Sequence, residues 1–410
     1  MRRPAMGLVL ALLVLALLGL VLLGLARSGE PVPARVWAFH GACERVATER
    51  GPVALPDSEA VELLERFGFV GCASQGLRYL AFDRAGEPRC AVDIDSSATV
   101  LPAGRGRAVV VGGTTADLLD ERCQVRFSHP ADEAQVLLDG EVLVVSDEGR
   151  LLFLDPSGNQ RGEAGPGGAA GLAPLMVPAA SGAYLIVMGG GGSLDAFDPS
   201  GRRLGRIWPG ANRRAHAVAG GRDRVYLAAS VSQLATAGSG LDPAAAATDS
   251  RDDDEVLGAW ALDGTPLWQE ELDSPERDVT GLWAWPDGRG TVVAFADFEP
   301  GRARVASRRL EVRGPDGALL WARGLDGALD DMRIDVAFAG RSGDLAVTCS
   351  EGSPGARRAT VQVLAPDGRV RGVLHLNDWT RDGGARLSAR GRFLLVNRVE
   401  SGLLELYEVP

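Results

Sequence analysis

The sequence predicts an all-β fold, a β-propeller built from four-stranded blades. Three observations lead to this prediction. A short apolar strand followed by a tight turn recurs along the chain, and a second apolar strand precedes each copy. The unit repeats every 35–60 residues, roughly the period expected of propeller blades. In addition, the 410 residues include 54 Gly and 23 Pro, which suits a fold with many turns.

The clearest copy of the repeat is Leu151–Gly158. Its alternating apolar residues predict a half-buried strand. Pro156 sets the backbone angle at the start of the turn, and Asp155 and Gly158 tolerate the left-handed conformations that close it. The turn glycines that we expect to share this structural role are Gly158, Gly201, Gly264, Gly317 and Gly368.

Eight pairs of second and third strands can be placed along the chain. They lie at about residues 68–83, 108–120, 141–155, 183–198, 224–263, 291–313, 344–364 and 392–409. The last pair lacks an outer strand because the chain ends at Pro410. Residues 34–39 are predicted to supply it, so that N- and C-terminal strands close the ring and remove exposed sheet edges. The propeller would thus occupy residues 35–410, with eight blades predicted and seven as the alternative, because the first blade is irregular.

Residues 57–68 allow two interpretations. Asp57 or Ser58 could cap a short helix that Gly68 would stop. The same stretch could instead form the inner strand of the first blade. The sequence pattern leaves both open.

One segment resembles a known repeat family. Ala261–Trp268 is similar to the quinoprotein-type, or PQQ-like, propeller repeat, in which an Ala-x-Asp turn leads into a strand carrying a docking Trp. Trp268, Trp321 and, more loosely, Trp208 stand where that Trp would fall. The resemblance spans most of residues 65–410. It implies either a dehydrogenase or a non-enzymatic scaffold, such as the lipoprotein of the outer-membrane β-barrel assembly machinery, so the fold does not decide the function.

Composition excludes several classes of function. The formal net charge is −11 and the isoelectric point is near 5.0, which argues against nucleic-acid partners, whose binders carry basic patches. All 43 basic residues are arginine. Without any lysine, the chain has no P-loop lysine, Schiff-base lysine or kinase-type lysine.

The N-terminus predicts a membrane anchor. Arg2 and Arg3 precede an uncharged run, and its core, Met6–Leu25, is long enough to span a bilayer as a helix. The two arginines favour a cytoplasmic N-terminus. We therefore predict a transmembrane anchor at residues 1–27 and a linker at residues 28–34. The propeller would lie on the periplasmic side of the inner membrane. The alternative is a signal peptide cleaved near Ala26, which would release a secreted or periplasmic protein.

The chain contains five cysteines: Cys43, Cys72, Cys90, Cys123 and Cys349. Outside the cytoplasm disulfides are permitted. Cys90 and Cys123 fall at similar places in two consecutive blades, which suggests one bridge and leaves Cys43 with Cys72 as a second. Spacing alone does not determine pairing, and several of these residues could instead be small buried hydrophobes.

The longest insertion and three tryptophans also allow predictions. The largest insertion, Ser232–Glu255, is predicted to be a surface loop that the fold does not need. Trp283 and Trp285 would point to one face of a strand, where they would pack between blades or line the channel mouth. Trp379 is predicted to lie in a loop, either exposed for recognition or packed against its blade.

No motif for catalysis or metal binding stands out, and the four histidines are scattered over different blades. We therefore predict no catalytic, cofactor-binding or metal-binding residues and no enzymatic activity. The predicted function is a membrane-tethered, extracytoplasmic scaffold that binds protein partners in the cell envelope. The alternatives are a carbohydrate- or ligand-sensing propeller and a PQQ-type dehydrogenase.

Overall fold

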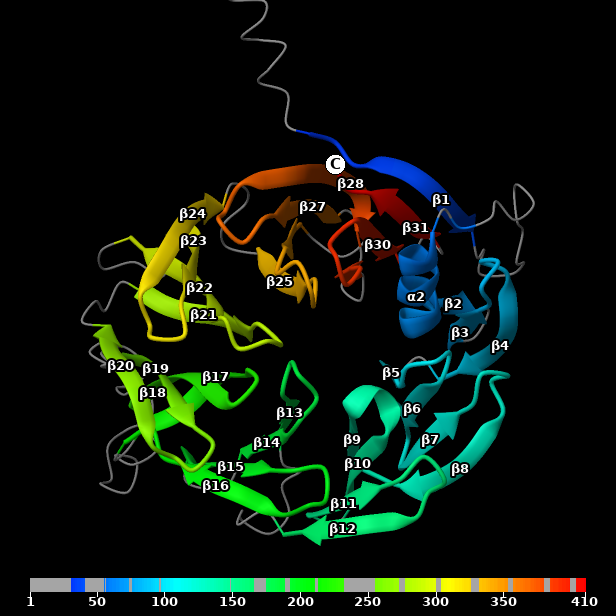
Figure 1. Ribbon diagram of the computed structural model, residues 1–410, viewed down its shortest axis with the longest axis horizontal. Coiled ribbons are helices and arrows are strands. Elements are labelled where there is room, and N and C mark those ends of the chain that lie inside the picture. The colour runs from blue at the N-terminus through cyan, green and yellow to red at the C-terminus, as the bar shows by residue number, and fades with distance from the viewer. Residues whose placement is uncertain are drawn as a thin grey trace, which may run out of the picture.

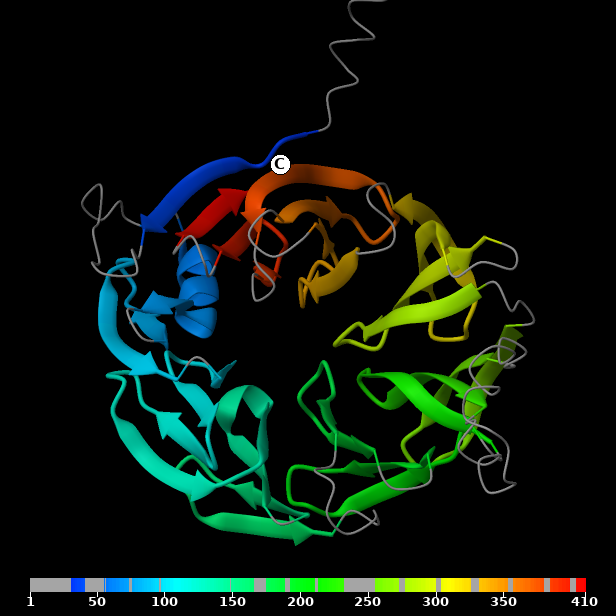
Figure 2. The ribbon, with the colours of Figure 1, turned by 180° about the vertical axis from the view of Figure 1, so that it is seen from behind.

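The computed structural model describes residues 31–40, 55, 57–73, 76–95, 97–147, 149–165, 175–188, 192–210, 213–231, 255–272, 277–299, 304–325, 332–352, 357–379, 384–398 and 403–410. Their strands form sheets that stand as blades around a central axis (Figure 1), and Figure 2 shows the same ring from behind. Seven of these sheets have four strands and one has three. The β-propeller predicted from the sequence is therefore the fold.

The sheets follow one another along the chain. The three-stranded sheet contains β2 (Phe69–Ala73), β3 (Gly76–Phe82) and β4 (Pro88–Ile94). The next two blades contain β5 (Thr99–Pro102), β6 (Ala108–Gly112), β7 (Thr115–Leu119) and β8 (Val125–Pro130), then β9 (Glu133–Leu137), β10 (Val142–Asp147), β11 (Arg150–Leu154) and β12 (Gln160–Ala164).

Two more blades contain β13 (Met176–Pro178), β14 (Leu185–Met188), β15 (Leu194–Phe197) and β16 (Arg203–Ile207), then β17 (Arg213–Gly220), β18 (Arg224–Val231), β19 (Glu255–Ala261) and β20 (Pro266–Leu272). They are followed by β21 (Arg277–Ala284), β22 (Thr291–Phe298), β23 (Val305–Arg313) and β24 (Leu319–Leu325), then by β25 (Arg333–Phe338), β26 (Leu345–Glu351), β27 (Arg357–Leu364) and β28 (Val370–Trp379). The last blade contains β29 (Gly384–Leu387), β30 (Phe393–Arg398), β31 (Leu403–Glu408) and β1 (Ala34–His40).

Within each four-stranded blade the first strand lies nearest the axis and the fourth lies on the rim (Figure 1). The predicted pairs of second and third strands correspond to β2–β3, β6–β7, β10–β11, β14–β15, β18–β19, β22–β23, β26–β27 and β30–β31. The four-stranded blades number seven, which is the alternative count, because the irregular first unit has only three strands.

Helix α2 (Ser58–Phe67) precedes the three-stranded sheet and stands near the axis, on the side where the other blades have their first strand (Figure 1). Of the two interpretations left open, the helix is the correct one. Asp57 caps it by accepting a hydrogen bond from the Glu59 N–H at 2.6 Å, and Gly68 ends it with a φ of 58°. Its apolar face, Ala60, Leu63 and Leu64, is buried between the last blade and the three-stranded sheet.

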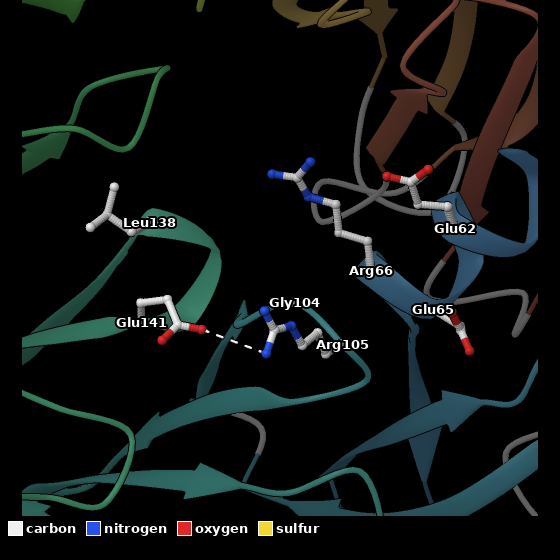
Figure 3. A pocket seen from close by; sticks show the side chains of 7 residues that line it. All are labelled: Glu62, Glu65, Arg66, Gly104, Arg105, Leu138 and Glu141. Carbon is white, nitrogen blue, oxygen red and sulfur yellow. Dashed lines mark ion pairs between the residues drawn. The ribbon is translucent and has the colours of Figure 1, made fainter.

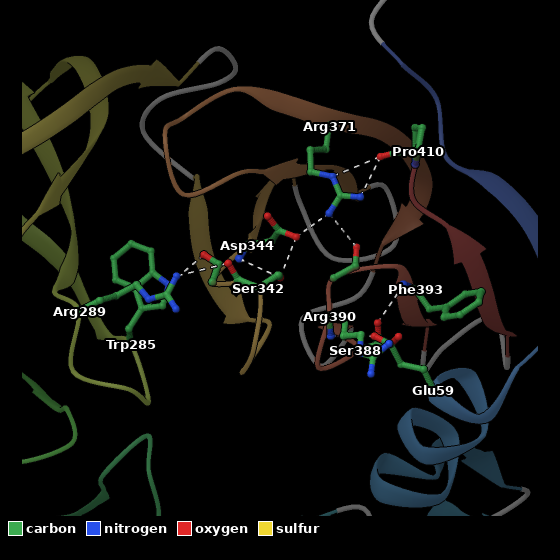
Figure 4. A network of polar contacts seen from close by, with 12 residues as sticks. Glu59, Trp285, Arg289, Ser342, Asp344, Arg371, Ser388, Arg390, Phe393 and Pro410 are labelled. Atoms are coloured by element: carbon green, nitrogen blue, oxygen red, sulfur yellow. Dashed lines mark hydrogen bonds and ion pairs between the residues drawn. The ribbon is translucent and has the colours of Figure 1, made fainter.

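The last blade closes the ring with strands from both ends of the chain. β1 pairs antiparallel with β31, from Ala34 opposite Glu408 to His40 opposite Leu403. Arg371 of β28 reinforces this closure, since its guanidinium donates to the backbone carbonyl of Pro410 at 2.9 Å (Figure 4). The same guanidinium pairs with the buried carboxylate of Asp344, so the end of the chain is held by the neighbouring blade.

Neighbouring sheets share one repeated contact position, the third residue of the outer strand, or the fourth residue in β1. There Trp268 of β20 lies under the turn at Gly317, and Trp321 of β24 lies under the turn at Gly368. A side-chain carbon on either glycine would come within 2.9 Å of the indole beneath it. These contacts are the interblade docking expected of Trp268 and Trp321. The predicted turn glycines have φ between 83° and 93°, a left-handed conformation that other residues rarely adopt.

The same position differs at the other junctions. Phe127 lies under Gly158, and Trp37 lies beside Gly86. The corresponding residues in β12 and β16 are Gly162 and Gly205, where an added Cβ would overlap a carbonyl oxygen of the next turn. The expectation for Trp208 is therefore wrong. Trp208 follows the end of β16 and is 52% exposed. The docking position in β16 is Gly205, where the next turn approaches the backbone too closely to admit an indole.

The N-terminal anchor proposed at residues 1–27 lies outside the described residues, as do residues 28–30 of the linker. In the part of the chain that the structure describes, no helix combines the length and apolar character needed to cross a membrane.

Deletion of residues 235–253 is expected to leave the fold intact. Residues 232–254 lie outside the described ranges, and the strands on either side, β18 and β19, pair with each other as far as Ala229 and Val256. Glu255 must stay, because its buried carboxylate accepts a hydrogen bond from the Val279 N–H at 3.2 Å. Thermal unfolding followed by circular dichroism should remain a single transition near the parent midpoint. A broad or stepwise transition would show that the insertion stabilises the ring.

Candidate functional site

The turns between first and second strands lie around the axis of the ring, at one end that we call the mouth, and α2 stands beside them (Figure 1). Two contacts hold the helix there. The Glu59 carboxylate accepts a hydrogen bond from the Arg390 N–H at 2.7 Å, and the Glu65 carbonyl accepts one from the Gly106 N–H at 3.1 Å. Because both ends of α2 are tied to neighbouring turns, its polar residues Glu62 and Arg66 face the mouth from a rigid support.

The turn after β5 has an unusual backbone. Gly104, Arg105 and Gly106 have φ of 65°, 54° and 72°. Holding a non-glycine residue in this region costs about 1–2 kcal/mol. The Arg105 side chain is 82% exposed and lies 3.8 Å from the Glu141 carboxylate. Beneath it Arg107 is buried and donates to the carbonyls of Gly104 at 3.4 Å and Ala103 at 3.3 Å, which braces the turn.

The next turn repeats this strain. Leu138 begins the short 3-10 helix η1 (Leu138–Gly140), has a φ of 50° and is 40% exposed. Its N–H donates to the Gly182 carbonyl at 3.3 Å. Gly140 passes so close to Ala103 that a Cβ would overlap the Ala103 carbonyl oxygen. The chain therefore presents an exposed leucine at the mouth by holding it in a conformation that leucine disfavours.

These elements enclose two adjoining open pockets, which we call the mouth groove. One, of about 350 Å³, is lined by Glu62, Glu65, Arg66, Gly104, Arg105, Leu138 and Glu141. The other, of about 420 Å³, is lined by Glu65, Arg84, Arg89, Arg105, Gly106 and Glu121. Figure 3 shows α2 carrying Glu62 and Arg66 on one side of the first pocket and Leu138 and Glu141 on the other.

The charges of the mouth groove balance. Its lining contains four glutamates, Glu62, Glu65, Glu121 and Glu141, and four arginines, Arg66, Arg84, Arg89 and Arg105. The ion pairs that link them are loose, with Arg84 3.6 Å from Glu65 and Arg105 3.8 Å from Glu141. Exposed pairs of this kind contribute little to stability, so they can exchange partners at low cost. Such a surface suits a polypeptide that has charges of both signs and an apolar side chain that can pack against Leu138.

A disulfide braces the outer wall of the groove. Cys90 and Cys123 are bonded, with their Cα atoms 5.8 Å apart, next to the lining residues Arg89 and Glu121. Cys90 is the third residue of β4, so the bond replaces the aromatic-on-glycine contact found at other junctions. Cys123 takes the place of the turn glycine and has its left-handed conformation, with φ of 56°.

The remaining cysteines do not contribute to this site. Cys43 lies outside the described residues, as does the side chain of Cys72, so the second predicted bridge stays a prediction. Cys349 is free, and burial raises the pKa of its thiol to about 12. A thiol with this pKa remains protonated and unreactive at neutral pH.

Trp285 and Trp379 have packing roles. Trp285 is 2% exposed and donates to the Gly343 carbonyl at 3.0 Å (Figure 4). Its ring lies tilted against Phe338 of the next blade, with the ring centroids 4.9 Å apart. Packing between blades, rather than lining of the mouth, is thus its role. Trp379 ends β28 and is 4% exposed. The loop expected at Trp379 is therefore wrong, and so is its alternative role as an exposed recognition residue.

Comparison with known proteins supports the fold. No family model matches the chain, and no curated protein matches it significantly. Among solved structures, BamB from Moraxella catarrhalis is 14% identical, with a TM-score of 0.51 over 92% of this chain and 100% of BamB. The computationally designed Ika8 protein is also 14% identical, with a TM-score of 0.51 over 83% of this chain and 92% of Ika8. At this identity the likenesses establish a β-propeller and do not distinguish PQQ-like repeats from others.

None of the residues selected from the sequence lines the mouth groove, although the Cys90–Cys123 bond borders it. Arg105 and Leu138 were missed, because each looks like an ordinary turn or strand residue. One signal was present in the sequence. Gly104-Arg105-Gly106 places two glycines around a charged residue between two apolar strands, which suggests a turn with left-handed residues.

Proposed function

We propose that this protein is a membrane-tethered, extracytoplasmic β-propeller that acts as a protein-binding scaffold in the cell envelope. Residues 1–27 would anchor it in the inner membrane, with the propeller on the periplasmic side. The proposal assigns a binding role rather than a catalytic one, with the mouth groove as the surface that receives the partner.

One observation supports this proposal above the others. Arg105 and Leu138 are two of the three non-glycine residues with positive φ among the described residues, and both line the mouth groove. Backbone strain tends to be retained where it positions side chains for a function. Here it places an arginine and an exposed leucine in the same pocket, in a groove whose charges balance. This combination fits recognition of another polypeptide better than recognition of a single ion or a sugar.

Replacement of Arg105 and Leu138 by asparagine is expected to abolish partner binding while sparing the fold. Asparagine tolerates the left-handed conformation, so Arg105→Asn with Leu138→Asn removes the charge and the apolar contact without adding strain. The full-length protein would be purified from native membranes in mild detergent, and co-eluting proteins identified by mass spectrometry. A partner recovered stoichiometrically with the parent should fall about tenfold or more in the double variant, as for loss of a binding hot spot.

Arg126→Asn is the matched control, because Arg126 is an exposed arginine on β8 that does not line the groove. The control should recover the partner like the parent. Equal recovery by the double variant would move the binding surface elsewhere on the ring. A parent protein that elutes with no stoichiometric partner would contradict the scaffold role itself.

A further inference from the structure

The outer strands carry a second repeated feature, a β-bulge at their second residue, or at the third residue in β1. In each sheet this residue is skipped in the pairing with the neighbouring strand of the blade. The eight bulge residues, in ring order from β1, are Val36, Arg89, Arg126, Arg161, Leu204, Leu267, Leu320 and Arg371. Arginine occupies four of these eight positions, and leucine occupies the three in β16, β20 and β24.

Two of these leucines are unusually exposed. Leu320 of β24 is 58% exposed and Leu267 of β20 is 46% exposed, whereas Leu204 is half-buried. Leu319, next to Leu320, is 54% exposed. We call Leu267, Leu319 and Leu320 the apolar rim. On the opposite side of the ring, β4, β8 and β12 have arginine at the same bulge position, and we call this the basic side of the rim. Val125 of β8, next to Arg126, is also 55% exposed.

The N-terminal segment reaches the ring close to the apolar rim. The Pro31 carbonyl accepts a hydrogen bond from the Val373 N–H of β28 at 2.9 Å, and Pro33 packs where a Cβ on Gly372 would lie. Val32 between them is 69% exposed. β28 is the outer strand next to β24 in the ring (Figures 1 and 2), and the Gly368 turn that leads into β28 rests on Trp321 of β24. The chain thus joins the propeller at its rim, one blade from Leu319 and Leu320.

The link to the predicted anchor is short. Four residues, 27–30, separate the uncharged run that ends at Ala26 from Pro31. The five extended Cα–Cα steps from Ala26 to Pro31 reach at most about 18 Å. The headgroup layer on each side of a bilayer is about 5–7 Å thick, since the whole bilayer is about 40–45 Å and its hydrocarbon core about 30 Å. If the run spans the membrane, the rim at Pro31 must lie at or very near the headgroups.

We propose that the apolar rim rests on the lipid bilayer, with Leu319, Leu320 and Leu267 inserted among the headgroups. This inference rests on the proposed membrane tether. The propeller then stands on its edge, with the channel axis parallel to the membrane plane. Both channel mouths, including the mouth groove, open sideways into the surrounding compartment, where a partner can reach them without meeting lipid.

Photocrosslinking of the full-length protein tests this orientation. The photoreactive residue p-benzoyl-phenylalanine would replace Leu320 in one variant and Arg126 in the control. Arg126 is the equivalent bulge residue on β8, on the basic side of the rim. Each variant would be reconstituted in vesicles of phosphatidylethanolamine and phosphatidylglycerol, irradiated, and examined by mass spectrometry for lipid adducts. We expect at least tenfold more lipid adduct at position 320 than at position 126.

The outcomes separate the orientation from the tether. Equal adduct yields at positions 320 and 126, in vesicles from which alkaline carbonate does not release the protein, would overturn the orientation and leave the tether intact. Release of the protein by carbonate would overturn the tether and the orientation with it. An adduct at position 320 to a second protein in native membranes, in place of lipid, would show that the apolar rim is a protein interface and would also overturn the inference.

Discussion

Replacement of Trp321 by alanine is expected to lower the free energy of unfolding by about 3 kcal/mol, the lower end of the range for core aromatic side chains, because the indole is half-buried. Trp321 packs under the Gly368 turn and donates its Nε1–H to the Pro366 carbonyl at 2.9 Å. The variant loses the contact between two blades and leaves that carbonyl without its partner. Denaturant unfolding followed by far-ultraviolet circular dichroism measures the change, because this signal does not depend on tryptophan fluorescence.

Trp268 provides a matched comparison at the preceding junction. Its ring packs under Gly317 in the same way, but its Nε1–H has no hydrogen-bond partner among the described residues. Trp268→Ala should therefore cost about 1 kcal/mol less than Trp321→Ala, the usual net value of a hydrogen bond. Trp268→Phe should be close to neutral, whereas Trp321→Phe should not. Unchanged stability in both alanine variants would refute the docking role.

Loss of the Cys90–Cys123 disulfide is expected to destabilise the fold by about 3–4 kcal/mol, the range for a bridge that closes a loop of this size. The sequence separation of the two cysteines is 33 residues. The variant Cys90→Ala with Cys123→Ala removes the cross-link but keeps a side chain at the left-handed position. The variant Cys90→Ala with Cys123→Gly removes the same cross-link and restores the residue that other blades use there.

The glycine variant should be more stable than the alanine variant by about 1 kcal/mol, because alanine is strained at a φ of 56° and glycine is not. Both should unfold at lower denaturant concentration than the parent, and the parent treated with reductant should behave like them. If the two variants were equally stable, Cys123 would not be equivalent to the turn glycines. Parent-like stability in both would show that the bond contributes nothing at this junction.

The repeated strands, the turns and the closure of the ring could all be predicted from the amino-acid sequence. Leu151–Leu154 is apolar and Gly158 can adopt a positive φ, and both properties depend on residues only a few positions apart. The pairing of the N-terminal strand with the last blade was predictable for a different reason: the last unit lacks an outer strand, and residues 34–39 have the pattern of one.

The helix, the docking positions and the mouth groove depend on contacts between blades, which local sequence patterns do not specify. Residues 57–67 have a pattern compatible with helix or strand, and the helix forms because its apolar face fills the space between the last blade and the three-stranded sheet. Gly162, Gly205 and Cys90 look unrelated in the sequence, yet they occupy the same docking position as Trp268 because each meets the next turn. Arg105 and Leu138 converge on the mouth groove from separate blades. Local patterns specify strands and turns, whereas the site arises only where residues distant in the chain are packed together.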